Sequence, residues 1–134
     1  MGQIITALSH SSTIVRWSAA KGVGRITERL PSHCADDVLD AILLLFHDTN
    51  NDRCWHGVCL ALTELARCGL LLPPGLHEVI PFLIQAVHCD RRRGPVNVGA
   101  HVRDAACYMY WAFHGHMIQK SYNRSFRIRH KPVY

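Results

Sequence analysis

The sequence has no apolar run that approaches the length of a membrane span. The run Ala41–Phe46 is only six residues long, whereas a transmembrane helix needs about 20. No segment shows the alternation of apolar and polar residues that is typical of a half-buried strand. With 134 residues, 49% of them hydrophobic, the chain is large enough for one domain with a core. These features predict an all-α domain.

The sequence also lacks a Cys-x-x-Cys pair and a secretory signal, so neither a zinc ribbon nor a disulfide framework is expected. The closest cluster of possible ligands is Cys54, His56 and Cys59, but helical spacing points Cys54 away from Cys59. We therefore expect buried, reduced thiols of a cytoplasmic protein, and no metal or cofactor. The six cysteines are Cys34, Cys54, Cys59, Cys68, Cys89 and Cys107.

No catalytic signature is present. The serine, cysteine, histidine and aspartate residues do not form a nucleophile elbow or another known catalytic pattern. Gly22-Val23-Gly24 lacks the third glycine and the preceding strand of a dinucleotide-binding loop. We expect no enzyme activity, and we name no catalytic or cofactor-binding residue.

Acidic residues are absent from the last eighteen positions. The formal net charge is +5, and all of this excess comes from Met117–Tyr134, because Met1–His116 contains equal numbers of basic and acidic residues. We expect a neutral body at 1–116 and a basic, poorly ordered tail at 117–134. In the tail, Tyr122, Phe126 and Tyr134 alternate with five cations, so a small nucleic-acid or membrane-surface binding protein is the alternative function.

Apolar residues recur at helical spacing throughout the body. The first full helix is predicted from Ser12, a suitable N-cap, to the stop at Pro31, and Gln3–Leu8 resembles the end of an earlier helix. Four more helices are expected at about 35–48, 52–68, 76–89 and 100–114. Pro81 predicts a kink or a late start for the fourth full helix, Gly115 a stop for the fifth, and the segment 90–99 a loop.

The helices repeat in pairs at a long period. Val15-Arg16 and Val102-Arg103 both begin a helix and lead into small residues, and Trp17 and Trp55 occupy corresponding places. This pattern predicts a HEAT/armadillo-type α-solenoid of about two to three helix pairs, with a basic C-terminal tail. The small residues Ser18, Ala19, Ala20, Gly22 and Gly24 are expected to let neighbouring helices approach closely, and Arg16 and Arg103 are expected to pair with the end of the preceding helix, Arg103 with Asp90.

Three stretches, "VRWSAAKGVGRITERLP", "WHGVCLALTELARCGLLLP" and "RRGPVNVGAHVRDAACYMYWAF", resemble the tubulin-specific chaperone D family, also called the tubulin folding cofactor D family, over about Ile14–Phe113. The resemblance implies a section of a much longer cytosolic HEAT-repeat protein, present as a truncated isoform, a fragment or the product of an altered reading frame. We expect the family pattern to end near Gly115, and both ends of the stack to expose apolar helix faces that favour self-association.

The resemblance also implies function. Such proteins bind β-tubulin in the post-chaperonin folding and αβ-heterodimer assembly pathway, together with other tubulin folding cofactors and an Arf-like small GTPase, and the family as a whole has a GTPase-activator role. The resemblance also implies that the protein is located in the cytoplasm in association with microtubules. Nucleic acid is not an expected partner, and a membrane is one only if Gly2 is myristoylated, as Met1–Thr6 permits. The motif positions proposed for partner binding are Arg16, Trp17, Lys21, Trp55, Arg92 and Arg103.

Overall fold

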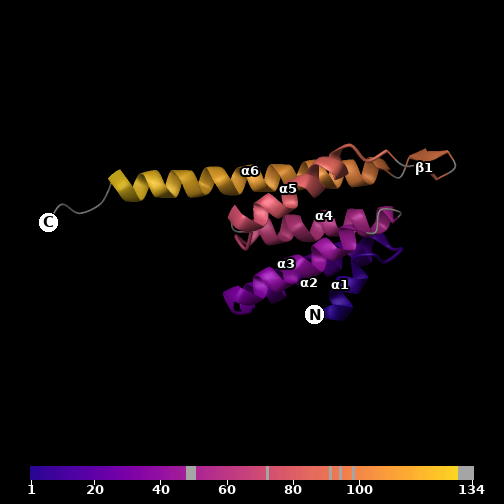
Figure 1. Ribbon diagram of the computed structural model, residues 1–134, viewed down its shortest axis with the longest axis horizontal. Helices are drawn as coiled ribbons and strands as arrows, with labels where there is room; N and C mark the ends of the chain where they lie inside the picture. The colour runs from indigo at the N-terminus through magenta and orange to yellow at the C-terminus, as the bar shows by residue number, and fades with distance from the viewer. Residues whose placement is uncertain (48–50, 72, 91, 94, 98, 130–134) are drawn as a thin grey trace.

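The computed structural model describes residues 1–47, 51–71, 73–90, 92–93, 95–97 and 99–129. Within these ranges, the side chains of 73–74, 92–93, 96 and 116–129 lie outside the description. The described part of the chain consists of six helices and one short hairpin (Figure 1): α1 (Gly2–Ala7), α2 (Thr13–Arg29), α3 (Ser32–Phe46), α4 (Asp52–Arg67), α5 (Pro73–Val87), β1 (Arg92–Arg93), β2 (Val96–Asn97) and α6 (Gly99–Arg129). Among the described residues, no helix has the length and hydropathy that crossing a bilayer requires.

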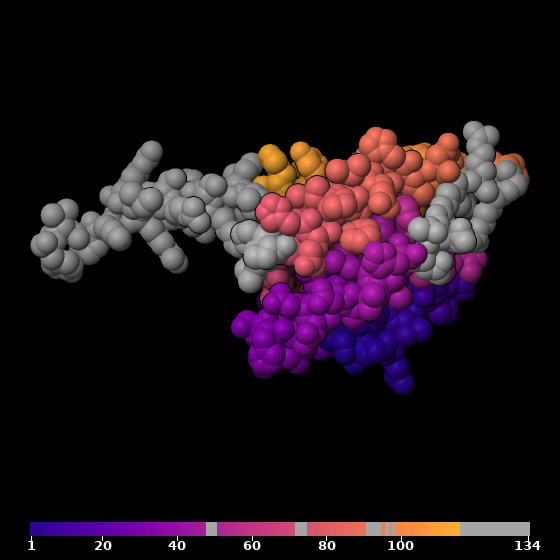
Figure 2. All heavy atoms as spheres, viewed as in Figure 1, coloured from indigo at the N-terminus to yellow at the C-terminus, as the bar shows by residue number. Residues whose placement is uncertain are grey.

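The helices stack in chain order into two layers, as an α-solenoid does. Helices α2, α4 and α6 lie side by side in one layer, while α3 and α5 pack on α4 and α6 from the other side. The short α1 lies against α2. The order is visible in the space-filling view, where the surface passes from the indigo N-terminal helices through α3 and α4 to α5 and α6 (Figure 2). The predicted all-α solenoid is confirmed.

Local sequence explains where the helices begin and end. Ser12 is the N-cap residue of α2, as predicted, and Asn51 caps α4 by accepting hydrogen bonds from the backbone N–H groups of Arg53 and Cys54 at 3.1 and 3.2 Å. Gly69, just after α4, has a φ of 73°, which is the left-handed conformation that favours glycine after a helix. These two signals fix α4, the central helix of the body.

The core is centred on α4, whose buried residues surround almost its whole circumference. Trp55 packs against Phe46 of α3 with ring centroids 4.8 Å apart, and Phe46 packs against Phe82 of α5 at 4.9 Å. Aromatic rings therefore connect α3, α4 and α5. Since α2 and α6 cover the remaining sides of α4, this helix carries an apolar sequence that a surface helix would not.

Small residues allow close packing at some of the predicted positions and at one that was not predicted. Ala20 and Gly24 of α2 are buried, and a Cβ at Gly24 would lie 3.2 Å from the Cβ of Glu64 in α4. Ser18 is exposed and Gly22 has ordinary space around it, so these two do not make the close contact. The closest approach is at Gly57 in α4, where a Cβ would lie 1.8 Å from the carbonyl oxygen of Leu8.

The C-terminal half of α6 corrects one prediction. The expected stop at Gly115 is wrong, because α6 continues to Arg129 and projects beyond the body (Figure 1). Gly115 lacks the positive φ that ends a helix at glycine, and the residues after it include methionine, glutamine, lysine and arginine, which favour helices. The proposed boundary between body and tail at 116/117 thus falls inside a helix, and residues 130–134 of the tail lie outside the described residues.

Three smaller differences concern α3, α5 and the segment before α6. Helix α3 begins at Ser32 rather than near Ala35, so Asp36 and Asp37 lie in its second turn. The predicted loop contains an antiparallel hairpin in which Arg92 pairs with Asn97 and Arg93 with Val96. Two residues per strand are too few to produce a detectable alternation. Helix α5 begins before Pro81 and continues through it, although Pro81 has no N–H to donate to the carbonyl oxygen of His77.

Candidate functional site

Arg16 is the most unusual residue of the body because its charged side chain is buried, with 7% of its surface exposed. Its Nε donates to Nδ1 of His56 at 3.1 Å, Nη1 to the carbonyl oxygens of His10 and Ser11 at 2.7 and 3.1 Å, and Nη2 to Oγ1 of Thr13 at 3.1 Å. These acceptors are all neutral. Arg16 therefore ties the start of α2 to the loop after α1 and to α4. The role is structural, as predicted, but these acceptors stand in place of the expected pairing with the end of the preceding helix.

The hydrogen bond from Arg16 also fixes the state of His56, which is 7% exposed. Because Nδ1 accepts from a guanidinium that is always a donor, the proton of the neutral imidazole must be on Nε2. Burial, with the nearby Arg16 charge second, lowers the pKa of His56 to about 4. The side chain is thus a neutral imidazole at pH 7 with a donor at Nε2.

His56 lies between two adjoining hollows on the layer of α2, α4 and α6. The first is a polar cavity of about 190 Å³ at the start of these helices. The second is a groove of about 340 Å³ that crosses all three helices. His56 and His101 line both, with ring centroids 6.4 Å apart. We call the first hollow the polar cavity; it is lined by Ser11, Arg16, Asp52, Arg53, His56, His101 and Val102. We call the second hollow the aromatic groove; it is lined by Thr13, Trp17, His56, Leu60, His101, Asp104, Ala105 and Tyr108.

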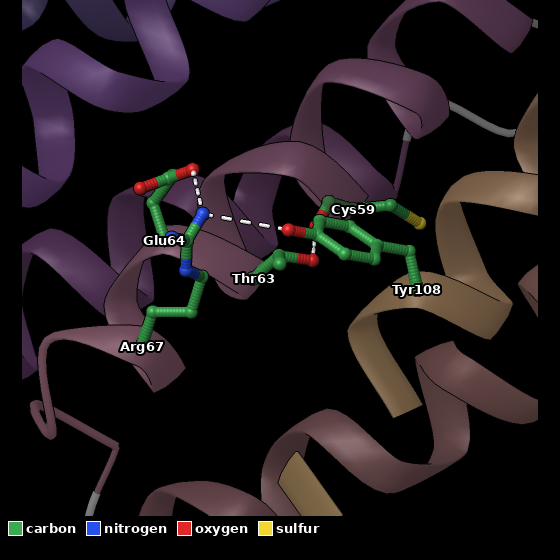
Figure 3. A network of polar contacts seen from close by, with 5 residues as sticks. All are labelled: Cys59, Thr63, Glu64, Arg67 and Tyr108. Atoms are coloured by element: carbon green, nitrogen blue, oxygen red, sulfur yellow. Dashed lines mark hydrogen bonds and ion pairs between the residues drawn. The ribbon is translucent and has the colours of Figure 1, made fainter. Parts of the chain in front are cut away.

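Two aromatic side chains stand on opposite sides of the aromatic groove. Trp17 projects from α2 with 38% of its surface exposed, and Tyr108 projects from α6 with 37% exposed, while the buried Leu60 of α4 lies in the floor. Tyr108 is held in place by Arg67 of α4, whose Nη1 lies 3.4 Å from the tyrosine hydroxyl and 3.5 Å from a carboxylate oxygen of Glu64 (Figure 3). Thr63, on the same stretch of α4, donates a hydrogen bond from its hydroxyl group to the carbonyl oxygen of Cys59 at 2.8 Å. The groove has a preformed wall.

The six positions proposed for partner binding separate into different environments. Trp17 lines the aromatic groove, and Lys21 is exposed one helical turn further along α2. Arg16 lines the polar cavity but is engaged in the hydrogen bonds described above. Trp55 is buried in the core against Phe46, so it has no surface to offer a partner.

The two remaining positions lie away from the aromatic groove. Arg103 donates to the carbonyl oxygen of Cys89 at the end of α5. The expected partner, the carboxylate of Asp90, instead accepts from Nδ2 of Asn97 at 3.2 Å. Arg103 thus binds the segment that follows the preceding helix, as expected, but through a backbone carbonyl group and not through the carboxylate of Asp90. Arg92 begins the hairpin, but its side chain lies outside the described residues.

Among the described residues that line the aromatic groove, seven were not proposed from the sequence as partner-binding positions: Thr13, His56, Leu60, His101, Asp104, Ala105 and Tyr108. The pairs His56 and Leu60 on α4, and Asp104 and Tyr108 on α6, have the i, i+4 spacing that places side chains on one helix face. This spacing is a usable signal, but it acquires meaning only when α2, α4 and α6 are known to form one layer. From the sequence, His56 was weighed only as a possible metal ligand. Among the described residues, no three potential metal ligands lie close enough together to hold an ion.

A second, wholly different surface lies between α5 and α6. It is an apolar groove of about 680 Å³, lined by Leu76, Ile80, Leu83, Ile84, Val87, His88, Cys107, Tyr110, Phe113 and His114. Ile84 is 56% exposed and Tyr110 61% exposed. This is the kind of exposed apolar face that was expected at the end of the stack, on the side where a further helix pair would pack.

Comparison with known proteins identifies the family. The family model for ARM repeats of tubulin-specific chaperone D-like proteins matches residues 1–125. The tubulin-specific chaperone D of Dictyostelium discoideum is 43% identical over 111 residues, which cover 79% of this chain and 8% of that protein. The tubulin-folding cofactor D of Schizosaccharomyces pombe is 31% identical over 132 residues, which cover 88% of this chain and 12% of that protein. No solved structure matches significantly.

The comparisons also correct the expected end of the resemblance. The family pattern does not stop near Gly115, because the match includes the part of α6 that projects beyond the body, to residue 125. The chain spans about a tenth of the length of these two relatives. It belongs to the family of tubulin-specific chaperone D-like ARM-repeat proteins.

Proposed function

We propose that this chain is a β-tubulin-binding section of a tubulin-folding cofactor, which works by contact with its partner and not by chemistry on a substrate. The observation that supports this function is the family match over residues 1–125, together with relatives that are named as tubulin-specific chaperone D and tubulin-folding cofactor D. Other tubulin folding cofactors and an Arf-like small GTPase are the further partners that we propose for the longer protein. Its setting is the cytoplasm and the microtubule cytoskeleton, and GTPase activation is the activity of the whole.

We place the contact with β-tubulin at the aromatic groove. Aromatic residues at the centre of an interface supply large buried area at little entropic cost, and tryptophan and tyrosine dominate interface hot spots. Trp17 and Tyr108 are partly exposed on either side of the groove, and Lys21 extends the same face of α2. Solenoids commonly bind partners on the extended surface of one helix layer. The layer of α2, α4 and α6 has the shape and composition for this role.

The test compares two tryptophan substitutions. Trp17→Ala removes a groove wall, whereas Trp111→Ala removes a tryptophan that is 72% exposed on α6 and does not line the groove. We expect the full chain to capture β-tubulin made by in vitro translation, Trp17→Ala to weaken capture about tenfold or more, and Trp111→Ala to leave it within twofold. Circular dichroism of both variants controls for folding.

Two outcomes would contradict the proposal. If the folded chain captures no β-tubulin, this section lacks the activity that we assign to it. If capture occurs but falls steeply between about 50 and 200 mM salt and is unchanged in Trp17→Ala, the contact is electrostatic. Such a result would favour the alternative, a nucleic-acid or membrane-surface binder that works through the basic residues at the end of the chain.

A further inference from the structure

The polar cavity contains hydrogen-bond donors for which the described part of the chain supplies no acceptor. Arg16 has five N–H groups, four of which donate to the acceptors described above. The fifth, on Nη2, has no acceptor among the described residues. Nε2–H of His56 is likewise without an acceptor among them, although the side chain is more than nine-tenths buried. A buried donor with no partner is costly, so each of these N–H groups needs an acceptor from water, an ion or a ligand.

The charges around the cavity are also incomplete. Among the described residues, two guanidinium groups, of Arg16 and Arg53, and one carboxylate, of Asp52, line it, and these three groups together carry one excess positive charge. Burial and then the charge of Arg53 lower the pKa of Arg16, while Asp52 acts in the opposite direction. The surroundings therefore destabilise the buried cation. A single negative charge in the cavity would balance it, whereas a phosphate dianion would exceed the available charge and face Asp52.

The neighbouring aromatic groove indicates what kind of molecule carries the negatively charged group that would enter the polar cavity. The two hollows share His56 and His101, so a ligand that reaches the cavity continues past these rings into the groove. There it meets Trp17, Leu60 and Tyr108. Asp104, also in the groove, repels a second carboxylate at that end. A ligand that fits both hollows therefore has one carboxylate in the polar cavity and apolar groups in the aromatic groove.

We propose that the polar cavity binds the side-chain carboxylate of an aspartate or glutamate in a partner peptide, whose following apolar residues lie in the aromatic groove. The free N–H groups of His56 and Arg16 donate to the carboxylate oxygens, and Arg53 supplies the charge that attracts it. This inference deepens the proposed function, because it rests on the aromatic groove being the partner surface and specifies the segment that enters it.

The experiment measures fluorescence anisotropy of the full chain with the labelled peptide Ser-Gly-Glu-Leu-Phe-Gly-Ser and with its Gln counterpart, in which glutamine replaces the glutamate. We expect the Gln peptide to bind at least fivefold more weakly. Arg53→Gln should weaken binding of the Glu peptide at least fivefold. The matched control Arg25→Gln removes an equal charge from an exposed position on α2 that lines neither hollow, and should change binding less than 1.5-fold.

His56→Gln is a second variant, because a glutamine amide retains both an acceptor for Arg16 and a donor. We expect it to weaken binding of the Glu peptide less than Arg53→Gln does. Equal binding of the two peptides, or equal losses in Arg53→Gln and Arg25→Gln, would overturn the proposal, as would displacement of the peptide by inorganic phosphate at micromolar concentration.

Capture of β-tubulin by the same protein samples separates this inference from the proposed function. If β-tubulin is captured but the Glu and Gln peptides bind equally, the carboxylate site is wrong and the tubulin contact stands. If the Glu peptide binds selectively but β-tubulin is not captured, the carboxylate site stands and the proposed partner is wrong.

Discussion

Gly57 provides the sharpest test of the packing, because it lies inside α4, where alanine would favour the helix more than glycine does. Gly57→Ala should add about 1 kcal/mol through helix propensity alone. The added methyl carbon, however, would lie 1.8 Å from the carbonyl oxygen of Leu8, 2.7 Å from its carbonyl carbon and 3.1 Å from its Cα. All three are backbone atoms, so no side-chain rotation relieves the overlap.

The relief must come from displacement of α1 and Leu8. Leu8 is 0% exposed, and loss of its burial costs about 1.5–3 kcal/mol. Residual strain from overpacking adds about 1–3 kcal/mol. After the gain in propensity, we expect a net destabilisation of about 1.5–5 kcal/mol. For a domain of this size the melting temperature should fall by about 6–20 °C.

Circular dichroism at 222 nm during thermal and urea unfolding measures the effect. Gly22→Ala is the matched control, because its added carbon would lie 3.8 Å from Cγ2 of Ile4, an ordinary contact, and we expect it to stabilise the chain by up to about 1 kcal/mol. Equal or greater stability of Gly57→Ala relative to the unmodified chain would show that the backbone of Leu8 does not lie against Gly57 of α4 as described.

Three further predictions concern other parts of the body. His56 has a pKa of about 4 in the folded chain and about 6.5 when unfolded, so the unfolded state binds the extra proton as pH falls from 6.5 towards 4. Acidification from pH 7 to 5 should therefore remove about 2 kcal/mol more unfolding free energy from the unmodified chain than from His56→Gln; equal losses in urea titrations would refute this. Native thiol labelling followed by mass spectrometry should modify the exposed Cys107 and spare the buried Cys59, whose pKa is raised to about 12 by burial; rapid labelling of Cys59 would contradict the core. Ile84→Glu, in the apolar groove between α5 and α6, should reduce both binding of the dye ANS and self-association in analytical ultracentrifugation. Unchanged ANS binding and unchanged self-association would show that this face does not mediate contact between copies of the chain.

Much of the fold followed from sequence because its signals are local. Helical spacing and the cap residue Ser12 predicted α2 and α4 to within a few residues. The end of α6 was not predicted because glycine at position 115 permits a stop without requiring one. The contact at Gly57 depends on Leu8, the residue after α1, lying against α4, and no local pattern specifies that contact.

The candidate site was less accessible to sequence reasoning. Trp17 was found because it stands in a repeated motif, and it does line the aromatic groove. Trp55 stands in the same motif, but it faces Phe46 in the core, because the central helix of a stack is covered on more sides than its neighbours. The partners of Arg16 come from the preceding loop and from α4, and the role of His56 becomes visible only when those segments are brought together.

The most direct test of the central claim is site-specific photo-crosslinking with β-tubulin. The photoreactive residue p-benzoylphenylalanine would replace Trp17 in one sample and Trp111 in another, each in the full chain. The account predicts a crosslink to β-tubulin from position 17, in the aromatic groove, and none from position 111. Crosslinking from position 111 alone would place the contact outside the groove and contradict the account.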